Sequence, residues 1–241
     1  MKFFIKRIIE AVGLEVRAIM MYLSGEELAK YSDCRLLWKL KAQQPPGSDR
    51  YLEYPWMAAN LQLKRGRLLD VGSTATQILD AFLPRAVKIY GIDLNAREFS
   101  NKKINLVRGD IRQTSYPNNY FDEVVCISVL EHVGVAGRYS SDDDPKGDLK
   151  AMQEIRRVMK KGATLLLTVP YGIRDVLPIN RLYNKTRLGR LLKGFQLVSC
   201  EYRKFNTRFG FWFVSPEKDA AKTDMLKDRW YAVALVKAIK K

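Results

Sequence analysis

Residues 68–74 read LLDVGST, and this stretch decides the fold. Three apolar positions and one acid lead directly into a glycine, which is the pattern of a buried strand that ends in a tight turn. In an open parallel sheet, ligands bind beyond the carboxyl ends of the strands, and a glycine there lets the backbone approach them. The stretch therefore predicts the first strand of such a sheet and the position of a binding site.

Alternating strand and helix patterns follow this first strand. FDEVVCISV (121–129) and ATLLLTVP (163–170) are apolar almost throughout, which indicates strands that are covered on both faces. We predict an α/β, Rossmann-like, doubly wound and mostly parallel sheet of seven strands. The expected strands span 67–71, 87–94, 104–110, 121–129, 163–170, 195–202 and 231–239, and the expected helices span 74–83, 95–101 and 148–161.

The first 63 residues have helical rather than alternating patterns. We therefore divide the chain into an N-terminal helical extension or cap, 1–63, and a ligand-binding domain, 64–241. Charges interrupt the opening segment, so neither a signal peptide nor a transmembrane span is expected. Its apolar stripe most simply packs on its own domain, and peripheral membrane contact is the alternative. The expected helical segments are 1–23, 25–43 and 50–63, the last with Pro55 near a turn.

The chain has a net charge of +16 at pH 7, and its final third carries most of this charge. Residues 171–241 contain 16 Lys and Arg against 6 Asp and Glu, a net charge of +10. Such a field attracts phosphate-bearing partners, although a lysine-rich solubilising surface explains it more simply. The cysteines, Cys34, Cys126 and Cys200, lie far apart, which favours a reducing, cytoplasmic location without a disulfide framework or a zinc site.

The turn after the first strand lacks the glycines that a dinucleotide needs. The G-x-G-x-x-G positions read Gly72, Thr74 and Gln77, and side chains there obstruct a pyrophosphate. A ligand without phosphates, such as S-adenosylmethionine (SAM), does not need those glycines. Its aminoacyl tail is expected against Gly72, Ser73 and Thr74, with Asp70 binding the ammonium group directly or through water.

Acidic residues end the next two strands in the order that a nucleoside requires. Asp93 follows Gly72 by 21 residues, where a carboxylate accepts hydrogen bonds from both ribose hydroxyls. Asp110 is expected at the adenine amino group, with Ile111 covering the ring. Each acid alone is equally well explained as a helix cap or a solvated loop residue. The acids follow successive strands in the order that a bound nucleoside requires, and this order favours the binding role. The predicted cofactor-binding residues are Asp70, Gly72, Ser73, Thr74, Asp93, Leu94, Asp110, Ile111 and Ser128.

These segments resemble the class I SAM-dependent methyltransferases, specifically the broad type-11 group. The resemblance covers about residues 50–240 and rests on LLDVGST, YGIDLN, LVRGDI, FDEVVCISVLEHV and EIRRVMKKGATLLLTVPYG. It implies SAM as cofactor and methyl transfer as the reaction. The family usually has a second glycine after the first strand, and Thr74 replaces it here, which either narrows the space for the methionine tail or adds a hydroxyl contact to it.

Three further stretches resemble enzymes that are associated with glycan biosynthesis clusters. They are RYLEYPW (50–56), GRYSSDDDPKGDLKAMQEI (137–155) and WFVSPEKDAA (212–221). This second resemblance implies a small-molecule or glycan-type acceptor, and oxygen is the acceptor atom that we expect.

His132 is the only histidine of the chain and the candidate general base. It follows the fourth strand beside Glu131, on the wall where the acceptor is expected, and histidine ordinarily titrates near neutrality. Packing beneath the cofactor is the alternative role of His132. The spacing of these two residues and of 142–144 fits no metal site, so no metal is expected. The predicted substrate-binding residues are Glu131, Arg138, Tyr139, Tyr171, Arg174 and Arg181.

Two other functions are compatible with the sequence. An RNA methyltransferase would use the basic final third and TRFGFWF (207–213), which places aromatic residues beside arginine, although this stretch is equally typical of a hairpin in the core. The other alternative is a SAM-binding regulatory protein without catalysis.

Overall fold

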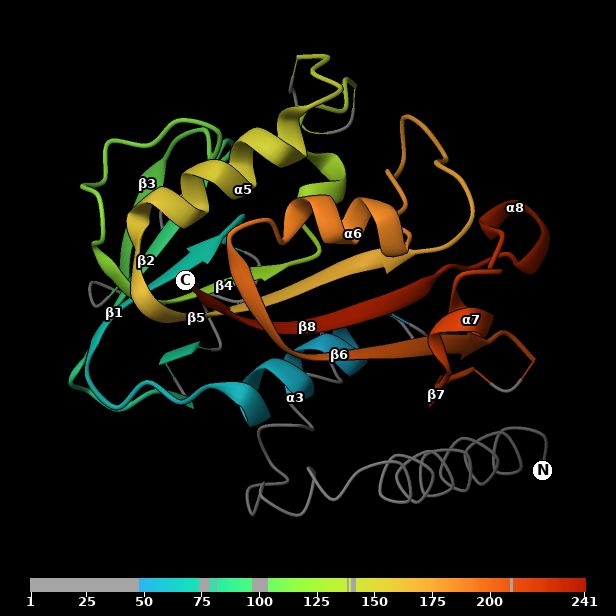
Figure 1. Cartoon of the computed structure of the whole chain (residues 1–241), viewed down its shortest axis with the longest axis horizontal. Helices are drawn as coiled ribbons and strands as arrows, with labels where there is room; N and C mark the ends of the chain where they lie inside the picture. Colours follow the sequence, from blue (N-terminus) through green and yellow to red (C-terminus); the bar gives the residue numbers. More distant parts are fainter. Residues whose placement is uncertain are drawn as a thin grey trace, which may run out of the picture.

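Eight strands form one sheet in the order β3-β2-β1-β4-β5-β8-β6-β7 (Figure 1). The computed structural model describes residues 48–73, 79–80, 82–96, 104–137, 139, 142–208 and 210–241. The two helical segments predicted before residue 44 lie outside these residues. The strands are β1 (Gly66–Val71), β2 (Val87–Asp93), β3 (Ile104–Arg108), β4 (Phe121–Ile127), β5 (Met159–Tyr171), β6 (Phe195–Asn206), β7 (Phe211–Val214) and β8 (Ala232–Lys240).

Parallel pairing joins the first five strands, and antiparallel pairing joins the last three to them. β3, β2, β1, β4 and β5 are parallel, whereas β8 pairs antiparallel with both β5 and β6. The mostly parallel α/β sheet is therefore confirmed. It contains eight strands within the described residues instead of the seven predicted, because TRFGFWF forms a hairpin that adds β7 to the outer edge of β6.

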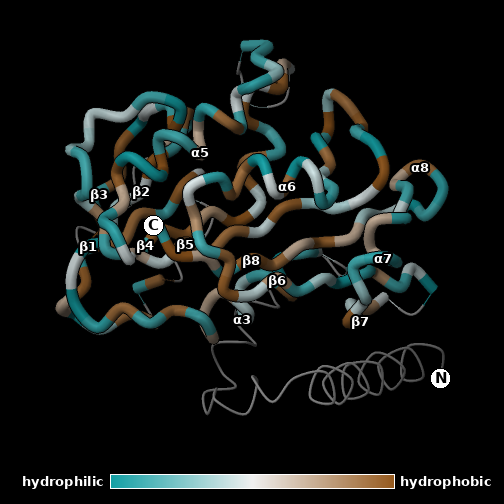
Figure 2. The backbone as a smooth tube through the Cα atoms, in the orientation of Figure 1, coloured by the Kyte–Doolittle hydropathy of each residue, from teal (hydrophilic) through white to brown (hydrophobic). Residues whose placement is uncertain are grey.

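Helices cover both faces of the sheet, as the apolar strands predict. In Figure 1, α5 and α6 lie over one face and α3 lies over the other. Figure 2 shows hydrophobic segments along the strands and hydrophilic ones along many of the surface loops. No helix in the described part of the chain is long and apolar enough to cross a membrane. The helices are α3 (Arg50–Asn60), α5 (Gly147–Val158), α6 (Lys185–Leu191), α7 (Glu217–Ala220) and α8 (Met225–Asp228).

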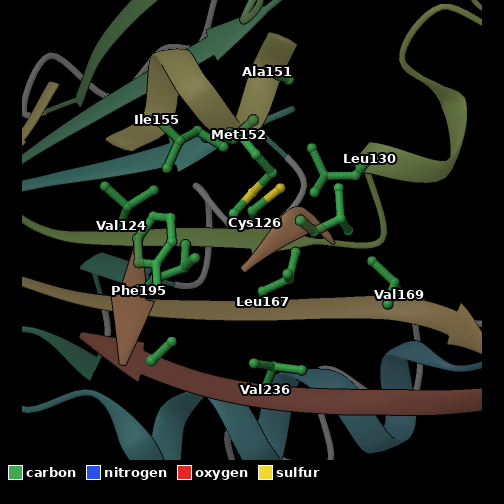
Figure 3. Packing of buried hydrophobic residues seen from close by; sticks show 14 of the residues in the cluster. Val124, Cys126, Leu130, Ala151, Met152, Ile155, Leu167, Val169, Phe195 and Val236 are labelled. Atoms are coloured by element: carbon green, nitrogen blue, oxygen red, sulfur yellow. The ribbon is translucent and has the colours of Figure 1, made fainter. Parts of the chain in front are cut away.

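β4 shows why its sequence is apolar without alternation. Val124 and Cys126 belong to the core layer beneath α5, whereas Val125 and Ile127 belong to the layer against α3, and all four are fully buried. Figure 3 shows Cys126 close to Met152 of α5 in the first layer. Successive side chains of a strand point to opposite faces of the sheet, and both faces are covered here, so all four residues are buried.

Several predicted boundaries shift for local reasons. The helix expected over 148–161 ends at Val158, because Met159 already pairs with Phe121 in the sheet. Pro55 lies inside α3 rather than near a turn. Of the helix expected over 74–83, Leu79, Asp80, Phe82 and Leu83 are described; the first three are helical, and Leu83 lies in a bend after them. Most of the helix expected over 95–101 lies outside the described residues.

Glu123 fixes the segment that leads into β1. Its Oε2 accepts a hydrogen bond of 3.1 Å from the backbone N–H of Leu63, and the side chain is almost fully buried. Burial raises the pKa of this carboxyl from 4.5 to about 7. The folded chain therefore binds a proton here more tightly than the unfolded chain does, and stability falls as the pH rises between these two values.

Replacing the Glu123 carboxyl with a neutral amide should remove the loss of stability that ionisation of this carboxyl causes as the pH rises. We expect Glu123→Gln to gain stability relative to the native chain as the pH rises from 5 to 8, by up to about 3 kcal/mol. Glu154→Gln is the matched control, because an Arg157 hydrogen bond lowers the pKa of Glu154 to about 2 and its ionisation is complete over this range. Urea unfolding at the two pH values measures both differences. A pH-independent difference for Glu123→Gln would show that the carboxyl does not titrate there.

Candidate functional site

A pocket lies at the carboxyl ends of β1 to β4, where the strand order reverses. It encloses about 750 Å³ of empty space, counting the part that is open to solvent. Sheets of this topology bind ligands at this edge, which is the position that LLDVGST predicts. The pocket brings together eight of the predicted site residues, namely Gly72, Asp93, Leu94, Asp110, Ile111, Ser128, His132 and Tyr139.

Gly72 forms the turn above β1. Its φ is +76°, a conformation that favours glycine, and its N–H donates to the carbonyl of Ile92 at 2.8 Å. A Cβ on this residue would lie 2.4 Å from Cγ2 of Val129, which also lines the pocket. Glycine is therefore needed at position 72 because Val129 packs too close for a Cβ. The sequence indicates a second reason, which is the approach of a ligand to the backbone of this turn.

Asp93 ends β2 at the pocket wall. Its Oδ1 accepts a hydrogen bond of 2.6 Å from the backbone N–H of Asn95, which fixes the carboxylate in the turn. Asn95 in turn donates from its side chain to the carbonyl of Tyr139 at 3.2 Å. The loop after η2, the short 3-10 turn Leu130–His132, is thereby tied to the end of β2.

Arg112 neutralises Asp110 in a way that the sequence analysis missed. Its Nη2 lies 2.6 Å from Oδ2 of Asp110, and its guanidinium also reaches the carboxylates of Asp142 and Asp144, each at 3.3 Å. Lys150 adds a further ion pair of 2.8 Å to Asp144. The acidic run after the fourth strand therefore forms part of a charge network beside the pocket. No group of His, Cys, Asp and Glu that could hold a metal ion occurs in the described part of the chain.

Glu53 attaches α3 to the sheet below the pocket. Its carboxylate is fully buried and accepts hydrogen bonds at Oε1 from the hydroxyls of Ser128, at 2.5 Å, and Thr168, at 2.6 Å. Arg50 forms an ion pair with Oε2. Burial raises the pKa of Glu53, and Arg50 and the two hydroxyls oppose this rise.

Arg50 reaches the pocket as a consequence of this attachment. It lines the same wall as Ser128 and Gly72. The resemblance that rests on RYLEYPW (50–56) does not single out Arg50, and the only local signal for this residue is its spacing of three residues to Glu53.

His132 and Tyr139 form part of the pocket wall, and Glu131 is buried beside His132. Nε2 of His132 lies 3.8 Å from Oε1 of Glu131, and the rings of His132 and Tyr139 pack with centroids 4.9 Å apart. Glu131 is buried directly behind the histidine, and burial raises the pKa of its carboxyl to about 8. Its Oε2 is buried and has no hydrogen-bond partner among the described residues.

Four predicted acceptor contacts, the buried Glu131 among them, are absent from the pocket lining. Tyr171 is fully buried in the core, because β5 continues through it. Arg174 pairs with Asp224 at 2.7 Å, away from the lining residues. Arg181 is buried and donates to the carbonyl of Val133 at 3.0 Å, so it supports the pocket wall from behind.

Two predicted cofactor contacts are also absent from the pocket lining. Asp70 is fully buried because it is an interior residue of β1, one step before the turn. Ser73 has a φ of +48° and a buried hydroxyl that lacks a hydrogen-bond partner within the described residues. Thr74 and Arg138 lie outside the residues that the structure describes, so their predicted contacts stay predictions.

Comparisons with known proteins place this site in a familiar fold. The model of the family described as "Caenorhabditis protein of unknown function, DUF268" matches residues 53–223. No curated protein matches the sequence.

Solved structures resemble the chain over most of its length. A SAM-dependent methyltransferase from Methanosarcina mazei is 17% identical with a TM-score of 0.52, over 76% of this chain and 96% of that one. A SAM-dependent methyltransferase from Thermotoga maritima is 18% identical with a TM-score of 0.52, over 79% and 89%. The [4+2]-cyclase SpnF is 20% identical with a TM-score of 0.50, over 73% and 75%.

These structures confirm the class I SAM-dependent methyltransferase fold. At such low identity they establish the fold and not the reaction. The type-11 and glycan-cluster resemblances stay predictions.

The requirement for glycine at the turn can be tested with a matched pair of variants. Gly162 has a φ of +78°, close to that of Gly72, but a Cβ there would meet nothing within 4 Å. We expect Gly162→Ala to cost about 1 kcal/mol of unfolding free energy from backbone strain alone. Gly72→Ala should cost about 2–4 kcal/mol, because Val129 must also move. Urea unfolding measures both, and equal costs would contradict the close approach of Val129.

Proposed function

We propose that this chain, which belongs to the DUF268 family, is an enzyme that uses SAM to methylate a small-molecule or glycan-type acceptor at oxygen. The observation that carries the proposal is the pocket at the switch point of a class I methyltransferase fold, where a glycine turn, a carboxylate and an arginine line one cavity. Each of these groups matches one part of SAM.

The residues of the pocket fit SAM better than a dinucleotide. Arg50 supplies a cation for the carboxylate of the aminoacyl tail, beside the turn at Gly72. Asp93 supplies an acceptor for the ribose hydroxyls. Leu94 and Ile111 are apolar lining residues at the adenine end of the proposed site. Gly72 also lines the pocket, and Val129 fills the space where a side chain at this position would lie.

Bound SAM would supply a methyl group that is already activated by its sulfonium. The chain then has to hold the acceptor in line and exclude water. The packed rings of His132 and Tyr139 provide such a wall, and the ties from Asn95 and Arg112 hold the neighbouring loop near it.

His132 is the group that would accept a proton from an acceptor hydroxyl. It lines the pocket, and Glu131 stands 3.8 Å behind it. A proton that arrives on Nε2 brings a positive charge next to this buried carboxyl, which favours the ionised form of Glu131 and the protonated form of His132 together. The pair is thus suited to hold a proton at the pocket wall.

The two alternatives differ in how much they are supported. Trp212 of TRFGFWF packs within the protein, with its ring centroid 5.2 Å from that of Phe205 and 6.4 Å from that of Trp230, whereas Phe213 is exposed. This packing favours the hairpin interpretation. The likeness to a cyclase shows that this fold also carries other reactions, so a SAM-binding protein without methyl transfer is the second candidate.

Two variants test the cofactor contacts separately. We expect Asp93→Ala to weaken binding of both SAM and 5′-methylthioadenosine by about 1–3 kcal/mol, because both ligands carry the ribose. Arg50→Met should weaken only SAM, since methylthioadenosine has no carboxylate. Calorimetric titration measures all four affinities, with thermal unfolding as the control for folding. Equal losses for both ligands in Arg50→Met would assign Arg50 a purely structural role.

A third variant tests the proposed base. His132→Ala should leave the SAM affinity nearly unchanged and slow methyl transfer by about 100-fold. The rate is measured as transfer of labelled methyl from SAM into fractions of a cell extract. An unaltered rate would return His132 to a packing role, label in the RNA fraction would favour the first alternative, and tight binding without transfer into any fraction would favour the second.

A further inference from the structure

The loop between β5 and α6 presents aliphatic side chains to solvent beside the pocket. Ile173, Leu177 and Ile179 of this loop and Leu226 of α8 are between 43 and 63% exposed. We name these four residues the apolar rim. Figure 1 shows the loop projecting from the carboxyl end of β5, near α8, and Figure 2 shows hydrophobic segments along it. Several exposed aliphatic residues close together mark an interaction site more often than a free surface.

Polar contacts within the protein hold this loop in place. Asp175 pairs with Arg187 at 2.5 Å and accepts the backbone N–H of Leu182 at 2.8 Å. The N–H of Val176 donates to the carbonyl of Asn180 at 2.9 Å. The polar groups of the loop are thus satisfied inside the protein, while its aliphatic side chains face water, which costs free energy unless another surface covers them.

The loop and α8 form one continuous surface. The backbone N–H of Ile173 donates to the carbonyl of Thr223 at 2.9 Å, and Arg174 pairs with Asp224 at 2.7 Å. Leu226 follows two residues later. The four side chains of the apolar rim therefore come from two segments that are joined directly.

The apolar rim also adjoins the pocket wall. The backbone N–H of Arg181 donates to the carbonyl of Glu131 at 3.2 Å, directly beside His132. A Cβ on Gly137 would lie 3.9 Å from Cβ of Pro178, which brings the loop against the segment that carries Tyr139. A partner that covers the rim therefore sits next to the opening of the pocket.

We propose that the apolar rim docks on the surface of an anionic lipid bilayer. Exposed cations flank it, namely Lys185 at the start of α6 and Lys222, Lys227 and Arg229 around α8. Of the neighbouring acids, Asp224 pairs with Arg174 and Asp219 with Lys222, and Asp228 is also exposed. The net charge of +10 in residues 171–241 adds a long-range attraction to anionic headgroups. Aliphatic side chains that enter the interface beside such cations are the pattern of a peripheral membrane contact.

Docking in this orientation presents the pocket opening to the bilayer. If the chain has the proposed methyltransferase function, the substrate class that fits this orientation is an amphipathic acceptor held in the membrane. The docking itself does not depend on the reaction.

Vesicle sedimentation of the full chain tests the docking. We expect the native chain to bind vesicles of phosphatidylcholine and phosphatidylglycerol more tightly than pure phosphatidylcholine, and less tightly as salt is raised. The triple variant Ile173→Ser, Leu177→Ser, Ile179→Ser should bind the mixed vesicles at least about tenfold more weakly.

A matched control separates the apolar rim from exposed aliphatic residues in general. Leu197 and Val198 are about half exposed at the start of β6, at the other end of the strands from the loop that follows β5. Leu197→Ser, Val198→Ser should leave vesicle binding unchanged. If the triple variant does not fold, Leu177→Ser alone serves in its place, with a smaller expected loss.

Two results would overturn the docking. One is a native chain that does not sediment with anionic vesicles, and the other is a triple variant that binds them as tightly as the native chain does. Calorimetric titration of SAM on the same samples keeps the two proposals apart: SAM binding without vesicle binding rejects the docking alone, and vesicle binding without SAM binding rejects the enzyme function alone.

Discussion

The buried carboxylate of Glu53 is the contact on which the site depends. It joins α3 to the ends of β4 and β5 through Ser128 and Thr168, and it holds Arg50 at the pocket. A carboxylate that is removed from water needs such partners, and loss of one member of a buried pair costs about 3–5 kcal/mol. The same three bonds therefore fix the helix on the sheet and set the charge of the pocket wall. Stability and binding are coupled at this point.

Much of the fold follows from the sequence because its signals are local. The strand that LLDVGST predicts ends one residue before Gly72, and β4 is apolar on both faces as FDEVVCISV indicates. The acids that end β2 and follow β3 reach one pocket because parallel strands place their carboxyl ends at a common edge. Order along the chain is here sufficient to predict proximity in space.

The contacts that sequence reasoning misses join residues far apart in the chain. Glu53 meets Ser128 across 75 residues and Thr168 across 115, and no periodicity reports such a pair. The sequence also does not show toward which side of a strand end a side chain points. Tyr171 is predicted at the acceptor because it follows the expected fifth strand, 163–170, but β5 extends to Tyr171 and its side chain lies in the core. Position at a strand end places a residue near the site, and only the pleat decides whether it faces the ligand.

The fold does not choose the reaction, so the proposed chemistry rests on the part of the pocket wall that carries His132 and Tyr139. A cyclase and SAM-dependent methyltransferases share this sheet, so the strand ends alone do not choose a reaction. In this chain the pocket wall holds a histidine 3.8 Å from a buried carboxyl, and burial raises the pKa of that carboxyl to about 8. Such a carboxyl is mostly neutral near pH 7 and becomes an effective counter-ion only when His132 gains a proton. On the proposed function, this pair would hold the proton that His132 accepts from the acceptor, whereas a packing role for His132 would make no use of it.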